Sequence, residues 1–249
     1  MLKRICVAVI AAALLQTSAS AEVVFSDDFS YADGPLAGNG NWVGHSGTLP
    51  LDVVSGAAVI NHGSGSRQDV NWNFADFSTG IISYQFDMVV DSSGPFGSGT
   101  DFEYFAHFGN TPDGGTTVDG GSFSARLDIT APTSTGDFSI GISSAESTAD
   151  FTTAQGFTFG SVVSVLVDYN LDTLTASLTV GGETVTGLVG DAALPINTFA
   201  LRQSTSSNNE SVTIDNLIVS HVTAIPEPSS MLALGVLGAF GAVRRRRRK

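Results

Sequence analysis

The chain has 249 residues, 28 of them glycine, and a formal net charge of −13. Such an acidic chain repels nucleic acid and anionic lipid, which excludes a nucleic-acid-binding protein. Its one cysteine, Cys6, excludes an internal disulfide, and its four scattered histidines lack the spacing of a zinc site.

Residues 1–21 form a predicted signal peptide. Lys3 and Arg4 give a basic start, residues 5–15 are apolar, and residues 19–21 (Ala-Ser-Ala) form a small-residue cleavage site. A retained N-terminal anchor is disfavoured because the apolar run is too short. Cys6 lies inside this segment, so we expect the exported domain to contain no cysteine.

The charge is more lopsided between residues 22 and 225. Of the 11 Lys and Arg residues, only Arg67, Arg126 and Arg202 lie there, against 23 acidic residues, which gives a net charge of −20. This surface would attract divalent cations or basic partners. Alternatively, the charge keeps the protein soluble in a salty exterior, where repulsion is screened within about 10 Å, and we favour this interpretation.

Short stretches of alternating apolar and polar residues fill the body of the chain and predict β-strands. In residues 122–130 the apolar side consists of Phe123, Ala125, Leu127 and Ile129, and the polar side of Ser124, Arg126 and Asp128. Similar patterns occupy residues 81–90, 138–142, 163–169, 174–180, 199–201 and 212–219. Residues 163–180 read as a hairpin. Roughly ten to thirteen strands predict an all-β fold, an antiparallel β-sandwich over residues 22–219.

Residues 25–42 read FSDDFSYADGPLAGNGNW, and residues 211–219 read SVTIDNLIV. These stretches resemble the opening and the closing strand of concanavalin-like (LamG-like) jelly rolls on bacterial surface proteins. The resemblance implies that the first and last strands lie side by side, which would bring Asp27 or Asp28 near Asp215. A structural calcium often joins the chain ends in such sandwiches, so these three carboxylates are candidate calcium ligands. The alternative is that they are solvated or form turn hydrogen bonds.

Trp42 and Trp72 are the candidate residues for carbohydrate contact. Jelly rolls bind sugars with exposed aromatic rings for stacking and with nearby Asn or Asp side chains for the hydroxyl groups. Both tryptophans lie near turns rich in Gly and Asn, with His45 and Asn73 close in sequence. The alternative is that both indoles pack in the core or at its rim.

Catalysis has little support in the sequence. A glycosidase needs two carboxylates across the scissile bond, and Asp101, Glu103 and His107 alternate along one predicted strand. The Glu-x-Asp-x-x-Glu arrangement of concanavalin-like glycosidases is absent, as are a Gly-x-Ser-x-Gly elbow and a phosphate loop. We therefore expect no enzyme.

An ice-binding surface would need a flat threonine ladder, of which one strand is present: Thr175, Ser177 and Thr179.

The end of the chain is a tail in three parts. The first is Pro226, Glu227 and Pro228, where proline holds the backbone extended. Residues 229–243 carry no charge and form a predicted single transmembrane helix. The cations that follow would stop the helix on the cytoplasmic side: Arg244, Arg245, Arg246, Arg247, Arg248 and Lys249.

This order of Pro-Glu-Pro, apolar helix and basic cluster resembles the PEP-CTERM sorting signal of Gram-negative bacteria. The resemblance implies recognition by an exosortase, a membrane-embedded enzyme that cuts near Pro-Glu-Pro, with residues 220–228 as the linker. The alternatives are a plain membrane anchor and a basic tail that binds nucleic acid, although such a tail would not need the apolar run before it. We expect an exported protein, anchored in the inner membrane before processing and then at the cell surface or in the exopolysaccharide matrix. Its head would be structural or adhesive; alternatives are a carbohydrate-binding (lectin-like) module, a polysaccharide-active enzyme or an ice-binding protein.

Overall fold

The computed structural model describes residues 21–94, 96, 103–112, 115–145, 149–190, 194–204 and 210–223. The predicted signal peptide apart from Ala21, the Pro-Glu-Pro motif, the predicted transmembrane helix and the basic cluster lie outside these ranges. Within the described ranges, no helix has the length and apolarity that a membrane crossing requires.

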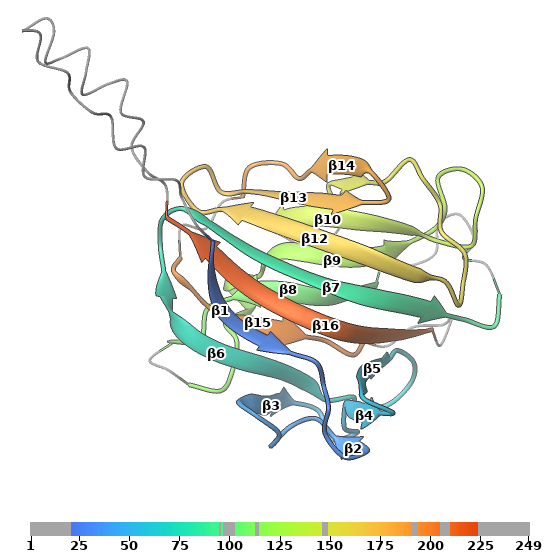
Figure 1. Ribbon diagram of the computed structural model, residues 1–249, viewed down its shortest axis with the longest axis horizontal. Coiled ribbons are helices and arrows are strands. Elements are labelled where there is room, and N and C mark those ends of the chain that lie inside the picture. Colours follow the sequence, from blue (N-terminus) through green and yellow to red (C-terminus); the bar gives the residue numbers. More distant parts are fainter. Residues whose placement is uncertain are drawn as a thin grey trace, which may run out of the picture. The chain divides into compact units, whose positions relative to one another are not determined.

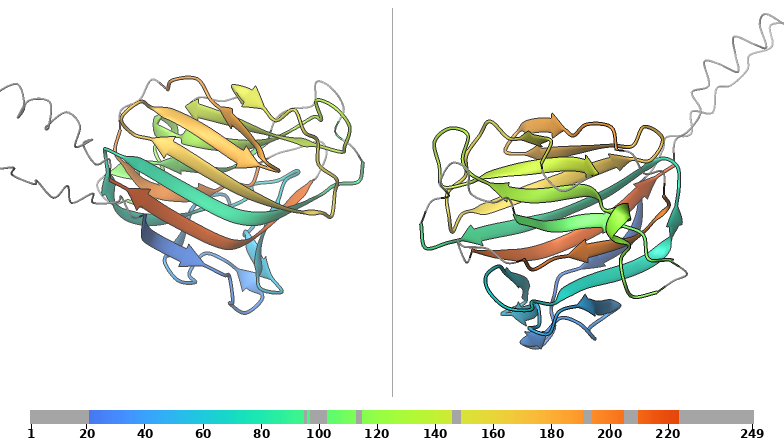
Figure 2. Two further views of the ribbon diagram at one scale, coloured as in Figure 1. Left: turned by 45° about the horizontal axis from the view of Figure 1, so that its top comes forward. Right: turned by 180° about the vertical axis from the view of Figure 1, so that it is seen from behind.

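Two antiparallel sheets pack face to face (Figures 1 and 2). Sheet A contains, in spatial order, β14 (Glu183–Thr186), β13 (Thr175–Val180), β12 (Val162–Asn170), β7 (Ile81–Asp91), β16 (Ser211–Val222), β5 (Ala57–Asn61), β4 (Asp52–Val54) and β2 (Gly34–Pro35). Strand β1 (Glu22–Asp27) pairs with the second half of β16. Sheet B contains β11 (Phe151–Thr152), β10 (Ser139–Ala145), β9 (Ser124–Thr130), β8 (Glu103–Gly109), β15 (Ile196–Leu201), β6 (Asp69–Phe77) and β3 (Trp42–Ser46).

This architecture confirms the predicted all-β antiparallel sandwich. The described residues form sixteen strands rather than ten to thirteen, because several strands are too short to show an alternating pattern. Strands β2 and β11 have two residues each, and β4 has three. The predicted hairpin is present: β12 pairs with β13 from Val165 opposite Val180 to Asn170 opposite Thr175.

The pairing of β1 with β16 confirms that the first and last strands lie side by side. Asp27 lies opposite Leu217, so the carboxylates of the opening segment come within two residues of Asp215 along the ladder. The two strands leave the chain ends of the head on the same sheet (Figure 1).

The core lies between the sheets and follows the alternation of the sequence. Strand β7 contributes one inward row, which consists of Ile82, Tyr84, Phe86, Met88 and Val90. Buried apolar side chains of this kind are the main source of stability in such a sandwich.

Sheet B departs from the simple pattern of an apolar inner face and a wet outer face. Strands β9 and β15 are buried along their whole length, on both faces. The inward side of β9 is apolar, with Leu127 in the core, whereas Arg126 and Asp128 point to the outer side and are still buried. Sheet B therefore holds buried charge on its outer face. Figure 2 (right) shows the strands of this sheet from that side.

Candidate functional site

Asp27 is a buried carboxylate that joins the two sheets. It is 7% exposed, and its Oδ1 accepts a hydrogen bond from the backbone N–H of Phe29 at 2.8 Å. Its Oδ2 accepts from the Tyr31 hydroxyl at 3.0 Å and from the Trp42 indole N–H at 2.7 Å. Both oxygens are thus engaged within the protein, and their role is to hold β3 against β1.

The other two candidate calcium ligands make local contacts. Asp28 is exposed and accepts from the N–H and the hydroxyl of Ser30, and these bonds lower the pKa of its carboxyl. Asp215 accepts from the N–H of Asn216 at 2.7 Å. Across the described ranges, no three His, Cys, Asp or Glu side chains are arranged to hold a metal ion. The calcium site at these three carboxylates therefore stays a prediction.

The tryptophans predicted to contact carbohydrate pack into the sandwich. Trp42 is 1% exposed, so its ring has no face open to solvent. Trp72 is half-buried and stacks on Phe25 with ring centroids 4.6 Å apart, while its edge meets Trp42 at 5.7 Å. The alternative of core and rim packing describes both indoles, because Trp42 belongs to the buried core and Trp72 packs against it.

The predicted pair of Glu103 and His107 lies on β8, and Asp101 falls outside the described residues. Both side chains are buried. His107 Nδ1 lies 2.9 Å from the carbonyl oxygen of Phe108, and burial lowers the pKa of His107 to about 3. The imidazole is therefore neutral at the pH of most environments.

An aromatic pair covers His107 on the outer face of sheet B. The ring of Phe123 lies 4.2 Å from the His107 ring, and Tyr104 lies 5.9 Å from both rings. Tyr104 and Phe123 are only half-buried, so part of each ring faces solvent. We call this surface the Tyr104 platform and define it by Tyr104, Phe123, Arg202 and Asp69.

The position of Phe123 corrects the sequence analysis, which placed it on the apolar side with Ala125 and Leu127. The residue lies before β9, directly after the short 3-10 helix η2 (Gly120–Ser122), so the alternation of the strand does not extend to it. Its ring packs on the opposite face, against His107. An aromatic residue beside a glycine-rich turn was the only signal of this placement in the sequence.

Two of the three arginines of the head meet at Tyr104. Strand β8 lies between β9 and β15, so Arg126 reaches the ring from one side and Arg202, directly after β15, from the other. Each guanidinium carbon lies 4.0 Å from the ring centroid, a distance at which cation–π attraction is effective. The sequence analysis missed this cluster because its members come from three strands.

The two arginines differ in their partners and their burial. Arg126 is 2% exposed, and its Nη2 lies 3.2 Å from Asp128 Oδ1. The Arg202 side chain is 27% exposed, and its Nε lies 3.9 Å from Asp69 Oδ2. The pKa of the Asp128 carboxyl is raised to about 7 because burial outweighs the attraction of Arg126. The pair of Arg202 and Asp69 is thus partly exposed to solvent, whereas the pair of Arg126 and Asp128 is buried next to the platform.

Several buried polar atoms of sheet B have no hydrogen-bond partner among the described residues. These atoms are Asn71 Oδ1 on β6, Arg126 Nε and Asp128 Oδ2 on β9, and Ser143 Oγ on β10. Ser143 lies opposite Arg126 in the ladder of β10 and β9, so these atoms belong to one face of sheet B. Buried polar atoms without partners are costly and mark sites that water or a ligand completes.

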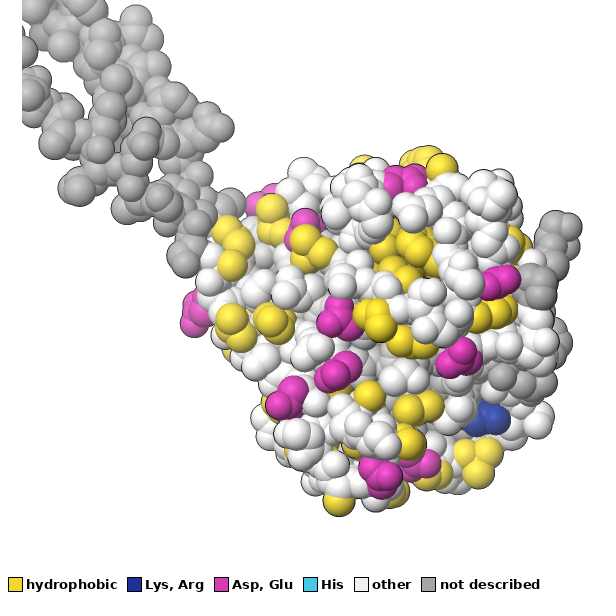
Figure 3. Space-filling view, turned by 45° about the vertical axis from the view of Figure 1, so that its right-hand side comes forward, with side chains coloured by type: hydrophobic (Ala, Val, Ile, Leu, Met, Phe, Trp, Pro, Cys, Tyr) yellow, Lys and Arg dark blue, Asp and Glu magenta, His cyan; other side chains and the backbone are white. Residues whose placement is uncertain are grey.

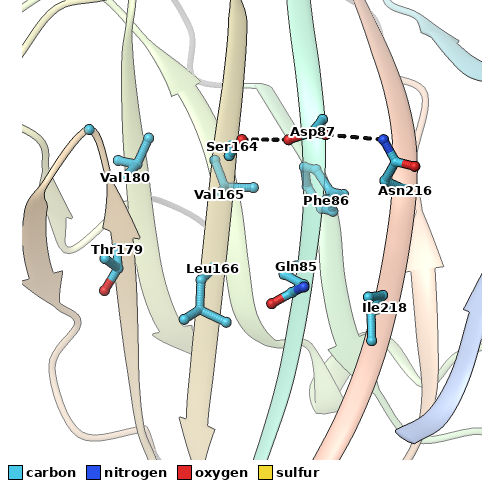
Figure 4. A pocket seen from close by; sticks show the side chains of 11 residues that line it. Gln85, Phe86, Asp87, Ser164, Val165, Leu166, Thr179, Val180, Asn216 and Ile218 are labelled. Atoms are coloured by element: carbon cyan, nitrogen blue, oxygen red, sulfur yellow. Dashed lines mark hydrogen bonds between the residues drawn. The ribbon is translucent and has the colours of Figure 1, made fainter.

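A shallow pocket of about 420 Å³ lies on the outer face of sheet A (Figure 4). Its polar row runs across three strands: Asp87 accepts a hydrogen bond from Ser164 at 2.5 Å and another from the Asn216 amide at 3.1 Å. Leu166 and Ile218 lie below this row on either side of Gln85. We call this the Asp87 pocket.

The head carries many acidic side chains on its surface. Asp and Glu side chains are spread over the face in Figure 3, between patches of apolar atoms. The cations of the head are Arg67, Arg126 and Arg202, and the last two gather at the Tyr104 platform. The platform is therefore a place where an otherwise acidic domain offers a guanidinium group to solvent, that of Arg202.

Comparison with known proteins identifies the tail and the fold. Residues 224–248 match the PEP-CTERM protein-sorting motif, which implies processing by an exosortase and sorting for export to the surface. The resemblance of the tail is thus confirmed. A sequence comparison with curated proteins gives no match.

Solved structures similar to the head share its fold at low identity. The CBM2 module of an evolved Dit protein of Lactobacillus casei BL23 phage J-1 has a TM-score of 0.52 and 10% identity, over 84% of this chain and 99% of that one. The basic winged bean lectin with Tn-antigen has a TM-score of 0.50 and 10% identity, over 82% and 100%. A sialidase has a TM-score of 0.50 and 12% identity, over 80% of this chain, which spans 18% of that protein's length. The head therefore has a concanavalin-like lectin fold.

Proposed function

We propose that this protein is an exported component of the cell surface or the exopolysaccharide matrix, and that its head adheres to polysaccharide. The PEP-CTERM tail supports delivery through an exosortase. The Tyr104 platform supports adhesion, because it combines half-exposed aromatic rings with polar side chains on one face of a lectin-like fold. The platform is the observation that carries the proposal.

The chemistry of the platform suits a sugar ring. Aromatic rings stack on the apolar faces of sugars. Phe123 is half-buried and packs on His107, so it is the candidate stacking ring, whereas Tyr104 lies between the two guanidinium groups and positions them.

Arg202 supplies hydrogen-bond donors. The oxygens of Asp69 each accept one bond, from Ser46 and from the N–H of Gln203, and each can accept another. The loose 3.9 Å contact between Arg202 and Asp69 leaves room for both to bond to hydroxyl groups of a ligand.

The proposal is of a binding protein and not an enzyme. The carboxyl of Asp128 lies beneath Arg126 and is fully buried, and His107 is covered by the ring of Phe123. Neither group is open to a scissile bond from solvent, as general acid–base chemistry requires. A passive matrix protein is the second candidate, supported by the same tail and by the acidic surface.

Affinity electrophoresis of the full-length protein tests the proposal, in gels that contain neutral or acidic polysaccharides and with a detergent that has no sugar head group. We expect at least one polysaccharide to retard the protein, and Tyr104→Ala and Phe123→Ala to abolish the retardation. Phe151→Ala removes another exposed ring, 46% exposed on β11, and serves as the matched control. If no polysaccharide retards the native protein, the head is a passive component of the matrix.

A further inference from the structure

We propose that the Asp87 pocket is a second carbohydrate site, which takes a neutral sugar ring through two neighbouring hydroxyl groups. The pocket lies on the outer face of sheet A and the Tyr104 platform on the outer face of sheet B, so the two sites point away from each other across the sandwich. A head with both sites would bridge two glycan chains. This bridging role rests on the proposed function, because it needs the Tyr104 platform as well. Sugar binding at the Asp87 pocket does not depend on the platform.

A bulge in β16 builds the polar row of the pocket. The ladder between β16 and β7 is broken between Asp215 and Ile218, and Asn216 there has a φ of 56°. Asparagine adopts this left-handed conformation more readily than most other residues apart from glycine, so it suits the bulge. The bulge directs the Asn216 amide across the strand to Asp87, as Figure 4 shows.

The pocket offers both acceptors and donors that the protein leaves free. Each oxygen of Asp87 accepts one hydrogen bond and can accept another. In the described part of the chain, nothing donates to Asn216 Oδ1, and the Gln85 amide forms no hydrogen bond. Two neighbouring sugar hydroxyl groups can each donate and accept a hydrogen bond. They can therefore donate to the Asp87 carboxylate and accept from the amides of Asn216 and Gln85.

The remaining lining explains why a ring would lie in the pocket. Leu166 and Ile218 are each paired with Gln85 in the neighbouring strands, so two aliphatic side chains flank the free amide. They are half-buried and form apolar walls against which the C–H groups of a sugar can pack. The walls and the polar row together define a site for an amphipathic ring.

The charge around the pocket selects against an anionic sugar. Asp87 lies directly opposite Asp215 in the ladder between β7 and β16. Two like charges in this position repel each other, and they would repel a ligand carboxylate or sulfate as well. We therefore assign the pocket to neutral sugars, whereas the Tyr104 platform, with the guanidinium of Arg202, also suits acidic ones.

Saturation-transfer NMR tests the pocket on the full-length protein in a detergent without sugar head groups. The probes are methyl α-D-mannopyranoside, methyl β-D-galactopyranoside and methyl β-D-glucopyranoside. We expect ring-proton signals for at least one probe, with a loss of fivefold or more in Asn216→Gly and in Gln85→Ala. Asn216→Gly keeps the backbone conformation, because glycine adopts a positive φ without strain.

Ser55→Gly is the matched control. Ser55 also has a positive φ, 53°, and lies in the turn between β4 and β5, where only its backbone N–H is bonded, to Asp33. This variant should keep the full signal. The inference is overturned if the native protein gives no signal with any of the three probes, or if Asn216→Gly and Ser55→Gly give equal signals.

The Tyr104→Ala variant separates this inference from the proposed function. We expect it to lose the retardation by polysaccharide and to keep the saturation-transfer signal. If Tyr104→Ala loses both, the platform is the single site and the Asp87 pocket is not one, although the proposed function stands. A signal in the native protein without retardation by any polysaccharide supports the pocket and overturns the proposed function.

Discussion

The indole N–H of Trp42 donates to Asp27 Oδ2 across 2.7 Å and thereby connects β3 of sheet B to β1 of sheet A. Both side chains are buried, so the bond links the two layers inside the core. Asp27 also accepts from Phe29 and Tyr31, and a carboxylate is the side chain with enough acceptor positions for all three donors. The opening segment of the head is thus held by one acid.

Asp27→Asn should destabilise the head by about 1–3 kcal/mol, because the amide turns one acceptor into a donor that faces a buried N–H or O–H group. Asp28→Asn is the matched control: Asp28 is exposed and, among the described residues, accepts hydrogen bonds from Ser30 alone, so we expect less than about 0.5 kcal/mol. Urea unfolding followed by tryptophan fluorescence measures both free energies. Equal effects of the two substitutions would mean that the link between the sheets contributes nothing.

A pair of glycines with positive φ separates a steric clash from backbone strain. A Cβ on Gly47 would overlap the backbone carbonyl of Arg67, whereas a Cβ on Gly56 would meet no atom within 4 Å. Their φ angles are 71° and 81°, so alanine is strained at both. We expect Gly56→Ala to cost about 1–2 kcal/mol and Gly47→Ala to cost more than about 3 kcal/mol or to prevent folding. Thermal unfolding distinguishes them, and similar melting temperatures would contradict the close approach at Gly47.

The sequence predicts this sandwich well because its strands bury one face, and burial imposes the alternation seen in β7, β12 and β13. The Tyr104 platform could not be predicted in the same way. Its side chains come from three strands that are neighbours only in the folded sheet, and Phe123 follows a turn and not a strand. Trp42 misled the sequence analysis because its partner, Asp27, lies fifteen residues away and in the other sheet.

The stability of the head should depend on pH through His62, His107 and Asp128. Burial lowers the pKa of each histidine to about 3, so near pH 5–6.5 the unfolded chain binds protons that the folded chain does not, and stability is lost as pH falls. Burial raises the pKa of Asp128 to about 7, so the folded chain keeps a proton that the unfolded chain releases, and stability is lost as pH rises towards 7. These two contributions oppose each other in this window.

Asp128→Asn removes the contribution of the acid and leaves that of the histidines. The free energy of unfolding of the variant should therefore fall more steeply on acidification from pH 6.5 to 5, by about 1.4 kcal/mol more per pH unit than in the native protein. Urea unfolding at several pH values in this range measures the two slopes. Parallel slopes would show that Asp128 is ionised in the folded protein throughout the window.

The two arginines that meet at Tyr104 should have opposite importance for stability. Arg202→Gln removes a half-exposed cation from a 3.9 Å contact with Asp69, and we expect a cost of about 0–1 kcal/mol. Arg126→Gln removes the buried partner of Asp128, and breaking such a pair costs about 3–5 kcal/mol at pH 8. The cost should be smaller at pH 5.5, where the Asp128 carboxyl is protonated and leaves no unpaired charge.

Addition of Asp128→Asn to Arg126→Gln should restore part of the loss at pH 8, because the double variant buries no charge. Urea unfolding at both pH values completes this double-mutant cycle, and additive effects would contradict a direct interaction between Arg126 and Asp128.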